Sequence, residues 1–230
     1  VFIGLFIRNG LDETPEFKRI RDSGQQVKMP LKEVLTKYWP AVLVSIGAKA
    51  AETGPFYIFG TYIVAYATNF LNIRDNIVLL AVACAALVAT IWMPLFGSFS
   101  DRVNRAALYR ICASATIVLI VPYYLILNTG EIWALFITTV IGFGILWGSV
   151  NAILGTVIAE NFAPEVRYTG ATLGYQVGAA LFGGTAPIIA AWLFEISGGQ
   201  WWPIAVYVAA CCLLSVIASF FIQRVAHQEN

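Results

Sequence analysis

The stretch NIVLLAVACAALVATIWMPLFGSFS, residues 76–100, contains no charged side chain. A helix needs about 20 mainly apolar residues to cross the hydrocarbon core of a bilayer, so this stretch is long enough for one membrane span. Three further uncharged windows of similar length cover residues 132–159, 168–194 and 196–223. The sequence therefore predicts an all-α membrane protein.

The composition of the whole chain agrees with this fold class. Of its 230 residues, 59% are hydrophobic and 12% are charged, whereas soluble domains carry about 25% charged residues. The 14 Lys+Arg and 13 Asp+Glu leave a formal net charge of +1, so the basic excess typical of nucleic-acid-binding proteins is missing. A soluble globule, a disordered chain and a nucleic-acid partner are excluded, and the lipid bilayer is the expected surrounding.

Six membrane spans are expected after residue 38. A window from 38 to 73 is broken only by Lys49 and Glu52, and another lies between Arg110 and Glu131. Together with the uncharged windows, they predict spans at 40–69, 77–99, 107–128, 132–159, 169–194 and 203–223. The first residues, VFIGLFIR, are apolar up to an arginine and lack an initiator methionine. We expect them to end another helix, in a chain that starts within a longer protein.

The basic residues predict the orientation. Alternating the six spans across the bilayer puts 12 of the 14 Lys and Arg on one side, with Arg74 on the other and Lys49 inside a span. Because cytoplasmic loops carry the excess of Lys and Arg, this side is expected to face the cytoplasm. The expected parts are the end of a transmembrane helix, a cytoplasmic loop, the six-helix bundle and a cytoplasmic tail, at 1–8, 9–38, 39–224 and 225–230.

The 9–38 loop contains two short helix signals. Thr14-Pro15-Glu16 combines an N-cap, a proline at the first helical position and an acid in the first turn, and Pro30 opens LKEVLTKYW in the same way. The loop is interpreted as an interfacial linker. A solvated connection and a regulatory segment both remain open.

The cysteines and the histidine predict no cofactor, metal site or enzyme. All four cysteines fall in apolar spans, where neither a disulfide framework nor a metal cluster is expected. His227, the one histidine, lies in the terminal tail. The chain therefore has no Ser/His/Asp arrangement for hydrolysis and no histidine pair for a metal ion.

Lys49 and Glu52 are the charged residues that most need an explanation, because a charge at the bilayer centre costs about 2.5–3.5 kcal/mol on insertion scales. They are three residues apart, on a helix face that also carries Ser45, Phe56 and Gly60. One interpretation is a mutual ion pair that holds the helix in its bundle. The other is a cavity-lining pair, in which Lys49 receives an anionic substrate and Glu52 carries a proton. The following Gly54-Pro55 is consistent with a kink beside a cavity.

Two other spans carry polar stripes. Trp147 and Asn151 share a helix face, and Tyr175 and Gln176 lie on the polar face of the 169–194 span. These side chains are candidates for hydrogen bonds to a substrate, or for interhelical packing. Gly183-Gly184 followed by Pro187 predicts a bend. The candidate substrate-binding set is Lys49, Tyr57, Trp147, Asn151, Tyr175 and Gln176.

Several loops resemble those of a transporter family. The loop Gly97-Ser-Phe-Ser-Asp-Arg-Val-Asn-Arg105 is similar to the G-x-x-S-D-R-x-G-R-R loop of the major facilitator superfamily. ENFAPEVRYTG at 160–170, followed by Gly174-Tyr-Gln176 and by Gly183-Gly184-x-x-Pro187, looks like the metabolite:proton symporter branch, as does Glu13-Thr14-Pro15-x-Phe17. The resemblance covers nearly the whole chain. It implies the C-terminal six-helix bundle of a twelve-helix major facilitator fold, preceded by the end of helix six.

The resemblance also implies a mechanism and a set of gate residues. Two six-helix halves of such a carrier rock about a central site, so the N-terminal half of the same protein is an implied partner. Cytoplasmic loop charges form ion pairs that close the inner gate, and the matching positions are Asp101, Arg102, Arg105, Glu160 and Arg167. Asn104 and Ala106 depart from the loop pattern, which predicts a weaker turn and charge network.

The function expected on these grounds is proton-coupled symport of a small organic acid or related metabolite, by alternating access, in a bacterial inner (plasma) membrane. Glu52 is the candidate proton-coupling residue, and Lys49 favours a carboxylate substrate. The alternatives are a carrier of zwitterionic osmolytes and a non-transporting sensor or scaffold that keeps the fold. An intramembrane enzyme would need a nucleophile or metal set that the sequence lacks.

Overall fold

The computed structural model describes the backbone of residues 29–227 and the side chains of residues 29–222. Within this range every regular element is helical and no strand occurs. The expectations for residues 1–8, for the first part of the 9–38 loop and for the last residues of the tail lie outside the described residues. Helix α3 (Pro30–Thr36) begins at the proline that the sequence marked as a helix start.

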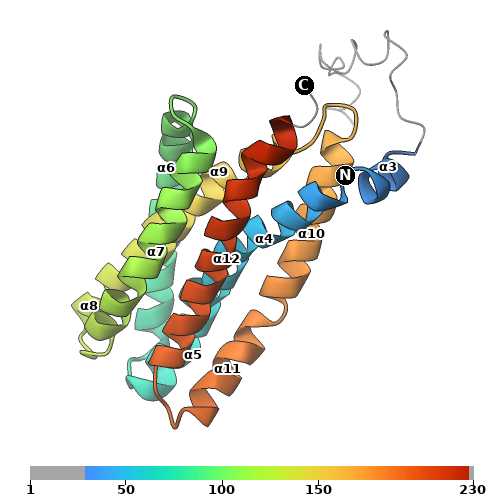
Figure 1. The fold of residues 1–230 in the computed structure, drawn as a ribbon. Helices are drawn as coiled ribbons and strands as arrows, with labels where there is room; N and C mark the ends of the chain where they lie inside the picture. Colours follow the sequence, from blue (N-terminus) through green and yellow to red (C-terminus); the bar gives the residue numbers. More distant parts are fainter. Residues whose placement is uncertain (1–28, 228–230) are drawn as a thin grey trace, which may run out of the picture.

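Six long helical rods follow α3 (Figure 1). Three of them are single helices and three are composed of shorter elements. The rods are α4 (Trp39–Phe56) with η1 (Tyr57–Tyr62) and α5 (Ile63–Phe70); α6 (Asp75–Ser100); α7 (Arg105–Leu127); α8 (Ile132–Thr139) with η2 (Val140–Trp147) and α9 (Gly148–Ala159); α10 (Arg167–Gly183) with α11 (Ala186–Ile196); and α12 (Trp202–His227).

The rods alternate in direction, so their connections gather at two ends (Figure 1). The loops at 101–104 and 160–166 lie at the same end as α3, and we call this the first end. The loops at 71–74, 128–131 and 197–201 lie at the other end. This placement agrees with the alternation assumed for the spans, and the cytoplasmic assignment of the first end stays a prediction.

Among the described residues, five helices are long and apolar enough to cross a membrane. They are Asp75–Ser100, Arg105–Leu127, Ile132–Ala159, Arg167–Ile196 and Trp202–Ile222. Each matches an expected span to within a few residues. The rod from Trp39 to Phe70, which carries Lys49 and Glu52, does not meet that criterion of length and composition. It lies among the other five, so the bundle has six rods although the membrane crossing of this one stays a prediction.

Two of the rods contain a π-helical segment, η1 and η2. The segment η1 begins two residues after Pro55, whose nitrogen has no hydrogen to donate to the helical ladder. A wider π turn keeps the chain helical at such a point. The expected kink beside Gly54-Pro55 is therefore realised as a change of helix type without interruption of the helix. The segments contact each other: a Cβ placed on Gly60 would lie 3.2 Å from the Phe143 ring.

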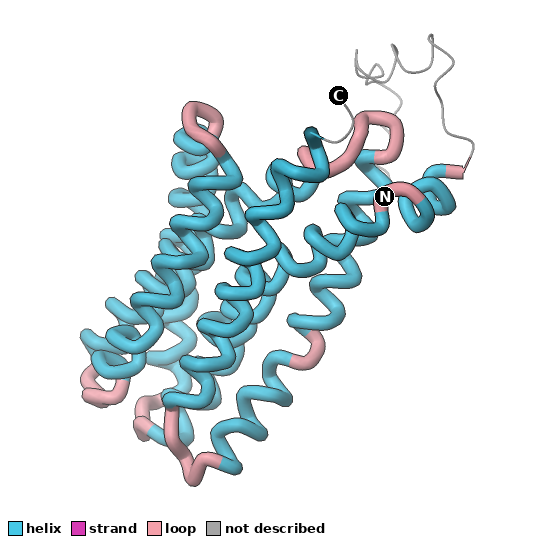
Figure 2. Tube along the Cα trace, viewed as in Figure 1, coloured by secondary structure: helices cyan, strands magenta, loops and turns pink. Residues whose placement is uncertain are grey.

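The rod of α10 and α11 is broken where the sequence predicts a bend. Helix α10 ends at Gly183 and α11 begins at Ala186, and the loop between them interrupts the helix (Figure 2). Pro187 occupies the first turn of α11, where its missing N–H costs no hydrogen bond.

Helix α4 is the centre of the packing, and its main neighbours are α10 and α12. Glycines of α10 allow the close approach of the two backbones. A Cβ placed on Gly174 would lie 2.5 Å from Ser45 Cβ, and one on Gly178 would lie 2.6 Å from Lys49 Cβ and 3.2 Å from the Ile46 carbonyl oxygen. These separations leave no room for a side chain, so the small residues determine how deeply α4 is buried.

Replacing Gly178 by valine is expected to force α10 away from α4. Overpacking of this kind costs about 1–3 kcal/mol, so the melting temperature of the purified full-length protein should fall. Gly155→Ala is the control, because nothing lies within 4 Å of a Cβ there, and it should melt at or slightly above the wild-type temperature. Equal melting of Gly178→Val and wild type would contradict the close packing.

Candidate functional site

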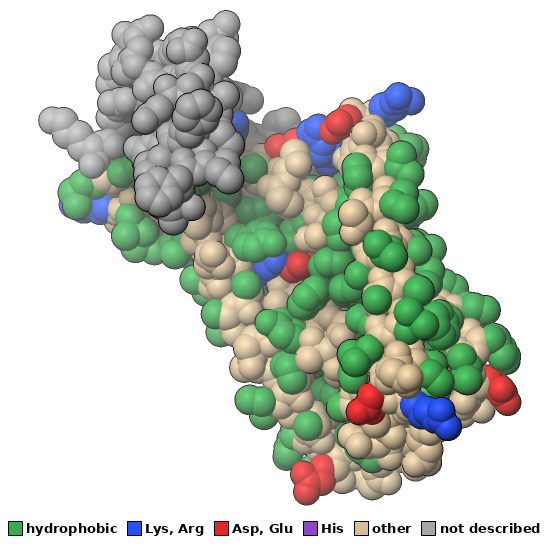
Figure 3. Space-filling model, turned by 180° about the vertical axis from the view of Figure 1, so that it is seen from behind, with side chains coloured by type: hydrophobic (Ala, Val, Ile, Leu, Met, Phe, Trp, Pro, Cys, Tyr) green, Lys and Arg blue, Asp and Glu red, His purple; other side chains and the backbone are tan. Residues whose placement is uncertain are grey.

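A buried ion pair lies midway along α4. Lys49 Nζ donates to Glu52 Oε2, and the Thr53 hydroxyl donates to the same oxygen at 2.7 Å. The side chains of the pair are only 3% and 9% exposed. Figure 3 shows one basic and one acidic side chain side by side midway along its face, away from the charges near the two ends. The mutual ion pair is therefore formed, and a role of these residues in binding substrate or protons stays a proposal.

Two hydroxyl groups from other helices hold the α4 backbone beside this pair. Tyr109 of α7 donates to the Ala48 carbonyl oxygen. Ser215 of α12 accepts a hydrogen bond from the Ala51 N–H at 2.8 Å and donates to the Gly47 carbonyl oxygen at 2.7 Å. Both side chains are fully buried. The helix turn that carries Lys49 is thus fixed from two sides.

Tyr175 of α10 covers the ammonium group of Lys49. The Lys49 Nζ atom lies 3.5 Å from the centroid of the Tyr175 ring, which is a cation–π contact. Tyr175 and the exposed Gln176 also line a pocket of about 250 Å³ between α9 and α10. Tyr175 therefore contacts both the pocket and the buried ammonium group.

An aromatic group lies one helical turn beyond Glu52. Trp147 stacks on Phe143 with ring centroids 4.6 Å apart, and its ring is 5.1 Å from that of Phe56. The buried Trp147 Nε1 has no hydrogen-bond partner among the described residues. Tyr57 contacts Phe56 edge to face at 5.3 Å. Trp147 and Tyr57 therefore both contact Phe56, which lies one helical turn beyond Glu52.

Asn151 is directed elsewhere. Its amide nitrogen lies 3.5 Å from Met93 Sδ of α6 and donates a weak hydrogen bond to it. The structure therefore brings Lys49, Glu52 and Tyr175 into direct contact, and the expected substrate contact of Asn151 has no support from this arrangement.

A second charged cluster lies at the first end of the bundle. Arg105, at the start of α7, donates to Asp101 Oδ1 at 2.8 Å and to Glu160 Oε1 at 2.5 Å. Glu160 directly follows α9, so the guanidinium group links the α6–α7 loop to the end of another rod. The three side chains are 31%, 65% and 49% exposed in the order Arg105, Asp101, Glu160. These three of the five gate candidates meet in one network.

Arg167 and Arg102 take different positions at the same end. Arg167 begins α10, and its Nε donates to the Phe162 carbonyl oxygen at 3.4 Å. Arg102 is exposed in the loop before α7. Glu160 follows α9 and Arg167 opens α10, so these two residues lie at adjoining helix ends.

The 97–105 loop forms both its turn and its charge network, and the expectation that they are weaker than in other carriers stays a prediction. Asn104 has a φ of −66°, so the position does not require glycine, and its side-chain oxygen accepts from the Ala107 N–H at 2.9 Å. Asparagine is one of the preferred N-cap residues of a helix. Asn104 therefore starts α7 at Arg105, and the network with Asp101 and Glu160 is complete.

Comparison with known proteins identifies the family. The sequence profile of the Major Facilitator Superfamily matches residues 1–175, which is more than half of the chain. The chain belongs to this superfamily.

Several named transport proteins are similar in sequence to this major facilitator chain. It is 25% identical to the proline/betaine transporter of Escherichia coli over 98% of this chain and 46% of that protein. It is 29% identical to the inner membrane metabolite transport protein YhjE of Escherichia coli, over 100% and 52% respectively. It is 24% identical to the citrate-proton symporter of Klebsiella pneumoniae, over 91% and 47%.

The major facilitator chain thus spans about half the length of the curated relatives it matches. Its membership and its five apolar helices make it a multi-pass membrane protein. The residue set predicted from the sequence omitted Thr53, Tyr109, Ser215 and Phe143. Thr53 adjoins Glu52 in the sequence and could have been included, whereas the other three come from distant helices, and no local pattern marks them.

The stability of the major facilitator bundle should depend on keeping Lys49 and Glu52 together. Leaving a buried charge uncompensated costs about 3–5 kcal/mol, so Lys49→Met and Glu52→Gln should each lower the melting temperature. The double variant should melt above either single one, because no charge remains to be paired. Unfolding can be followed with a thiol-reactive dye, since Cys112, Cys211 and Cys212 are buried. Additive losses in the double variant would contradict the pairing.

Proposed function

We propose that this chain is the C-terminal half of a secondary active transporter that works by alternating access and couples protons to a small organic acid or related metabolite. The observation that carries the proposal is the Lys49–Glu52 pair, buried midway along a helix of the bundle. Ionisable groups inside a membrane bundle are costly and commonly mark substrate and proton pathways. Family membership and the named transporters among the relatives support the same activity.

The pair offers a simple rule of coupling. In the closed state the carboxylate of Glu52 neutralises the ammonium of Lys49. A proton on Glu52 removes that negative charge, and an anionic substrate can then neutralise Lys49 in its place. An uncompensated charge in this region is strongly unfavourable, so the proton and the anion are expected to bind together. In this scheme one proton on Glu52 accompanies the one substrate carboxylate that Lys49 binds.

Tyr175 determines access to the cation in this scheme. Its ring lies against Lys49 Nζ and also lines the pocket between α9 and α10. A carboxylate that reaches Lys49 must displace the ring from the ammonium group. The phenol could then donate a hydrogen bond to the same carboxylate, and Trp147 would supply an indole N–H that has no partner among the described residues.

The Asp101–Arg105–Glu160 network is proposed to close the cytoplasmic side when the outer side is open. Ion pairs at exposed positions contribute about 0.2–1 kcal/mol each. Contacts of this size bias an equilibrium between two conformations without locking either one. Arg105 is the central residue of the proposed gate because it contacts both carboxylates, and Arg102 and Arg167 are proposed to add positive charge beside it.

A second candidate function, transport of a zwitterionic osmolyte, is favoured by the presence of both charges at one place. A zwitterion could bind its carboxylate to Lys49 and its cationic group to Glu52, with no proton needed to free the lysine. Relatives named for proline and betaine transport support this alternative. The two candidates differ in whether Glu52 must be protonated or ionised when substrate is bound.

Glu52→Gln in the full-length protein is expected to abolish the proton-driven accumulation of an organic acid in inverted membrane vesicles or in proteoliposomes. Exchange of labelled substrate without a gradient should persist, because Lys49 stays available to the anion. Glu195→Gln, which changes an exposed carboxylate at the end of α11, is the matched control and should transport normally. Full proton-driven accumulation by Glu52→Gln would disprove the assignment.

The same variant separates the two substrate classes. With a zwitterion as substrate, Glu52→Gln should lose exchange as well as accumulation, since the cationic group loses its partner. A thermal-shift screen of organic acids and osmolytes on the intact protein identifies which class raises the melting temperature, because a ligand that binds only the folded state stabilises it. Stabilisation of wild type by neither class, with no flux, would favour the sensor or scaffold alternative.

A further inference from the structure

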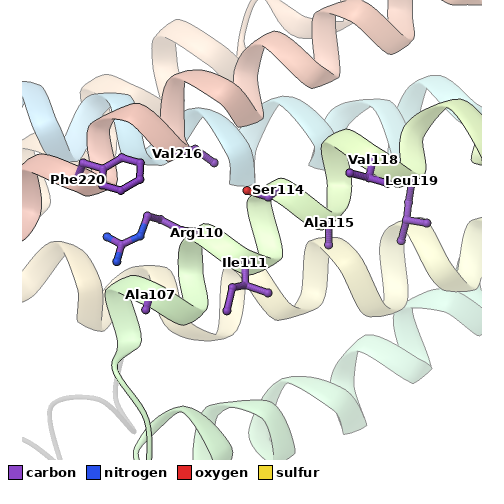
Figure 4. Close-up of a pocket in the computed structure, with 9 residues that line it drawn as sticks. All are labelled: Ala107, Arg110, Ile111, Ser114, Ala115, Val118, Leu119, Val216 and Phe220. Atoms are coloured by element: carbon purple, nitrogen blue, oxygen red, sulfur yellow. The ribbon is translucent and has the colours of Figure 1, made fainter.

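A groove runs along the outer surface of α7 and α12, and neither residue of the charge pair lines it. Its volume is about 680 Å³, and most of its lining is apolar. Figure 4 shows the lining residues along the two helices, among them Arg110, Ile111, Ser114, Val118, Val216 and Phe220. Helices α7 and α12 lie on the near face of the bundle in Figure 1.

The apolar lining is open to the surroundings of the bundle. The exposed fractions of Ile111, Val118 and Phe220 are 64%, 70% and 60%. A continuous apolar surface of this kind on a multi-pass membrane protein is the surface that contacts lipid acyl chains. The groove is therefore shaped for an extended hydrocarbon chain.

Arg110 is the cation of this groove. Its guanidinium group lies 4.7 Å from the centroid of the Phe220 ring and donates to the Ser219 carbonyl oxygen at 3.3 Å. A guanidinium group has five N–H donors, and no ion pair of Arg110 occurs among the described residues. Phe220 thus orients the cation while most of its donors remain available for an anionic group.

Arg110 lies close to the start of α7, where the boundary between headgroups and acyl chains is expected for a helix that spans the bilayer. It lies five residues into α7, or about 7.5 Å along the helix axis at 1.5 Å per residue. Its side chain extends toward Ala107 and the start of the helix (Figure 4). Long basic side chains near helix ends extend in this way so that the charge reaches the interface.

We propose that the α7–α12 groove binds an anionic phospholipid, with its phosphate on the Arg110 guanidinium group and an acyl chain along Ile111, Val118 and Val216. Arginine suits this role because its planar fork can donate two parallel hydrogen bonds to one phosphate. Ser114, one turn further along α7, lies where the glycerol ester groups of such a lipid would be. This lipid site is separate from the proposed substrate pathway.

Charge favours a lipid over a second copy of the chain in this groove. A two-fold symmetric contact places the same surface patch on both partners. Such a contact would bring Arg110 toward Arg110 in an apolar interface, with no carboxylate among the lining residues to compensate. A phospholipid provides the negative charge and the acyl chain in one molecule.

The test uses the full-length protein, purified in detergent and mixed with equal amounts of phosphatidylglycerol and phosphatidylcholine. Native mass spectrometry then counts the retained lipids. Wild type should retain phosphatidylglycerol preferentially. Arg110→Gln should weaken that retention about fivefold, the factor expected for one basic residue at an anionic membrane surface. Arg110→Lys should keep most of the preference, since it keeps the charge.

Two more variants serve as controls. Arg74→Gln removes a positive charge at the other end of the bundle and should leave lipid retention unchanged. Ala115→Phe fills the groove and should reduce the retention of both lipids without removing a charge. Each variant is checked for a wild-type melting temperature, so that loss of lipid is not mistaken for loss of fold.

Other outcomes would overturn the proposal. Equal retention of the two lipids by wild type, or an unchanged preference in Arg110→Gln, would mean that Arg110 does not select the headgroup. Displacement of phosphatidylglycerol by millimolar inorganic phosphate would identify a site for a soluble anion. A lipid-free dimer that dissociates in Ala115→Phe would identify a second copy as the occupant.

Discussion

A charge inside a membrane bundle must be neutralised, and the pairing of Lys49 with Glu52 is the constraint on which this structure depends. The pair requires a helix face that is buried in the bundle, and α4 packs against α10, α12 and α9. It also requires close neighbours, which the glycines of α10 permit. Tyr109 and Ser215 then fix the backbone that carries the lysine.

Because Lys49 and Glu52 are buried, only a few groups make polar contacts in this region. Every strong polar contact near Lys49 comes from a side chain one turn away or from a hydroxyl group on a neighbouring helix. Glu52 Oε2 accepts from both Lys49 and Thr53, and the Tyr175 ring covers the ammonium group, so the two charges compensate each other inside the bundle. In the proposed mechanism a substrate replaces one of these interactions when it binds, and selection between substrates acts at that exchange.

Much of the fold follows from the sequence, because in lipid the backbone must satisfy its own hydrogen bonds and helices are the simple solution. The uncharged windows placed five rods to within a few residues. The spacing of Lys49 and Glu52 placed them on one face, and Gly183-Gly184 with Pro187 placed the break between α10 and α11. The loop charges at Asp101, Arg105 and Glu160 were also grouped correctly at one end.

Other features could not be predicted, because they depend on contacts between distant helices. The π segments η1 and η2 leave no distinct periodicity in an apolar run, and the partner of Asn151 proved to be a sulfur atom of another rod.

The interruption between α10 and α11 divides one rod into two segments that do not share a continuous hydrogen-bond ladder. Helix α10 lies against α4, which carries the charge pair, while α11 contacts η1 and α12. A tilt of α11 therefore does not require the same tilt of α10. The break therefore permits α10 and α11 to differ in tilt, which one continuous helix would not allow.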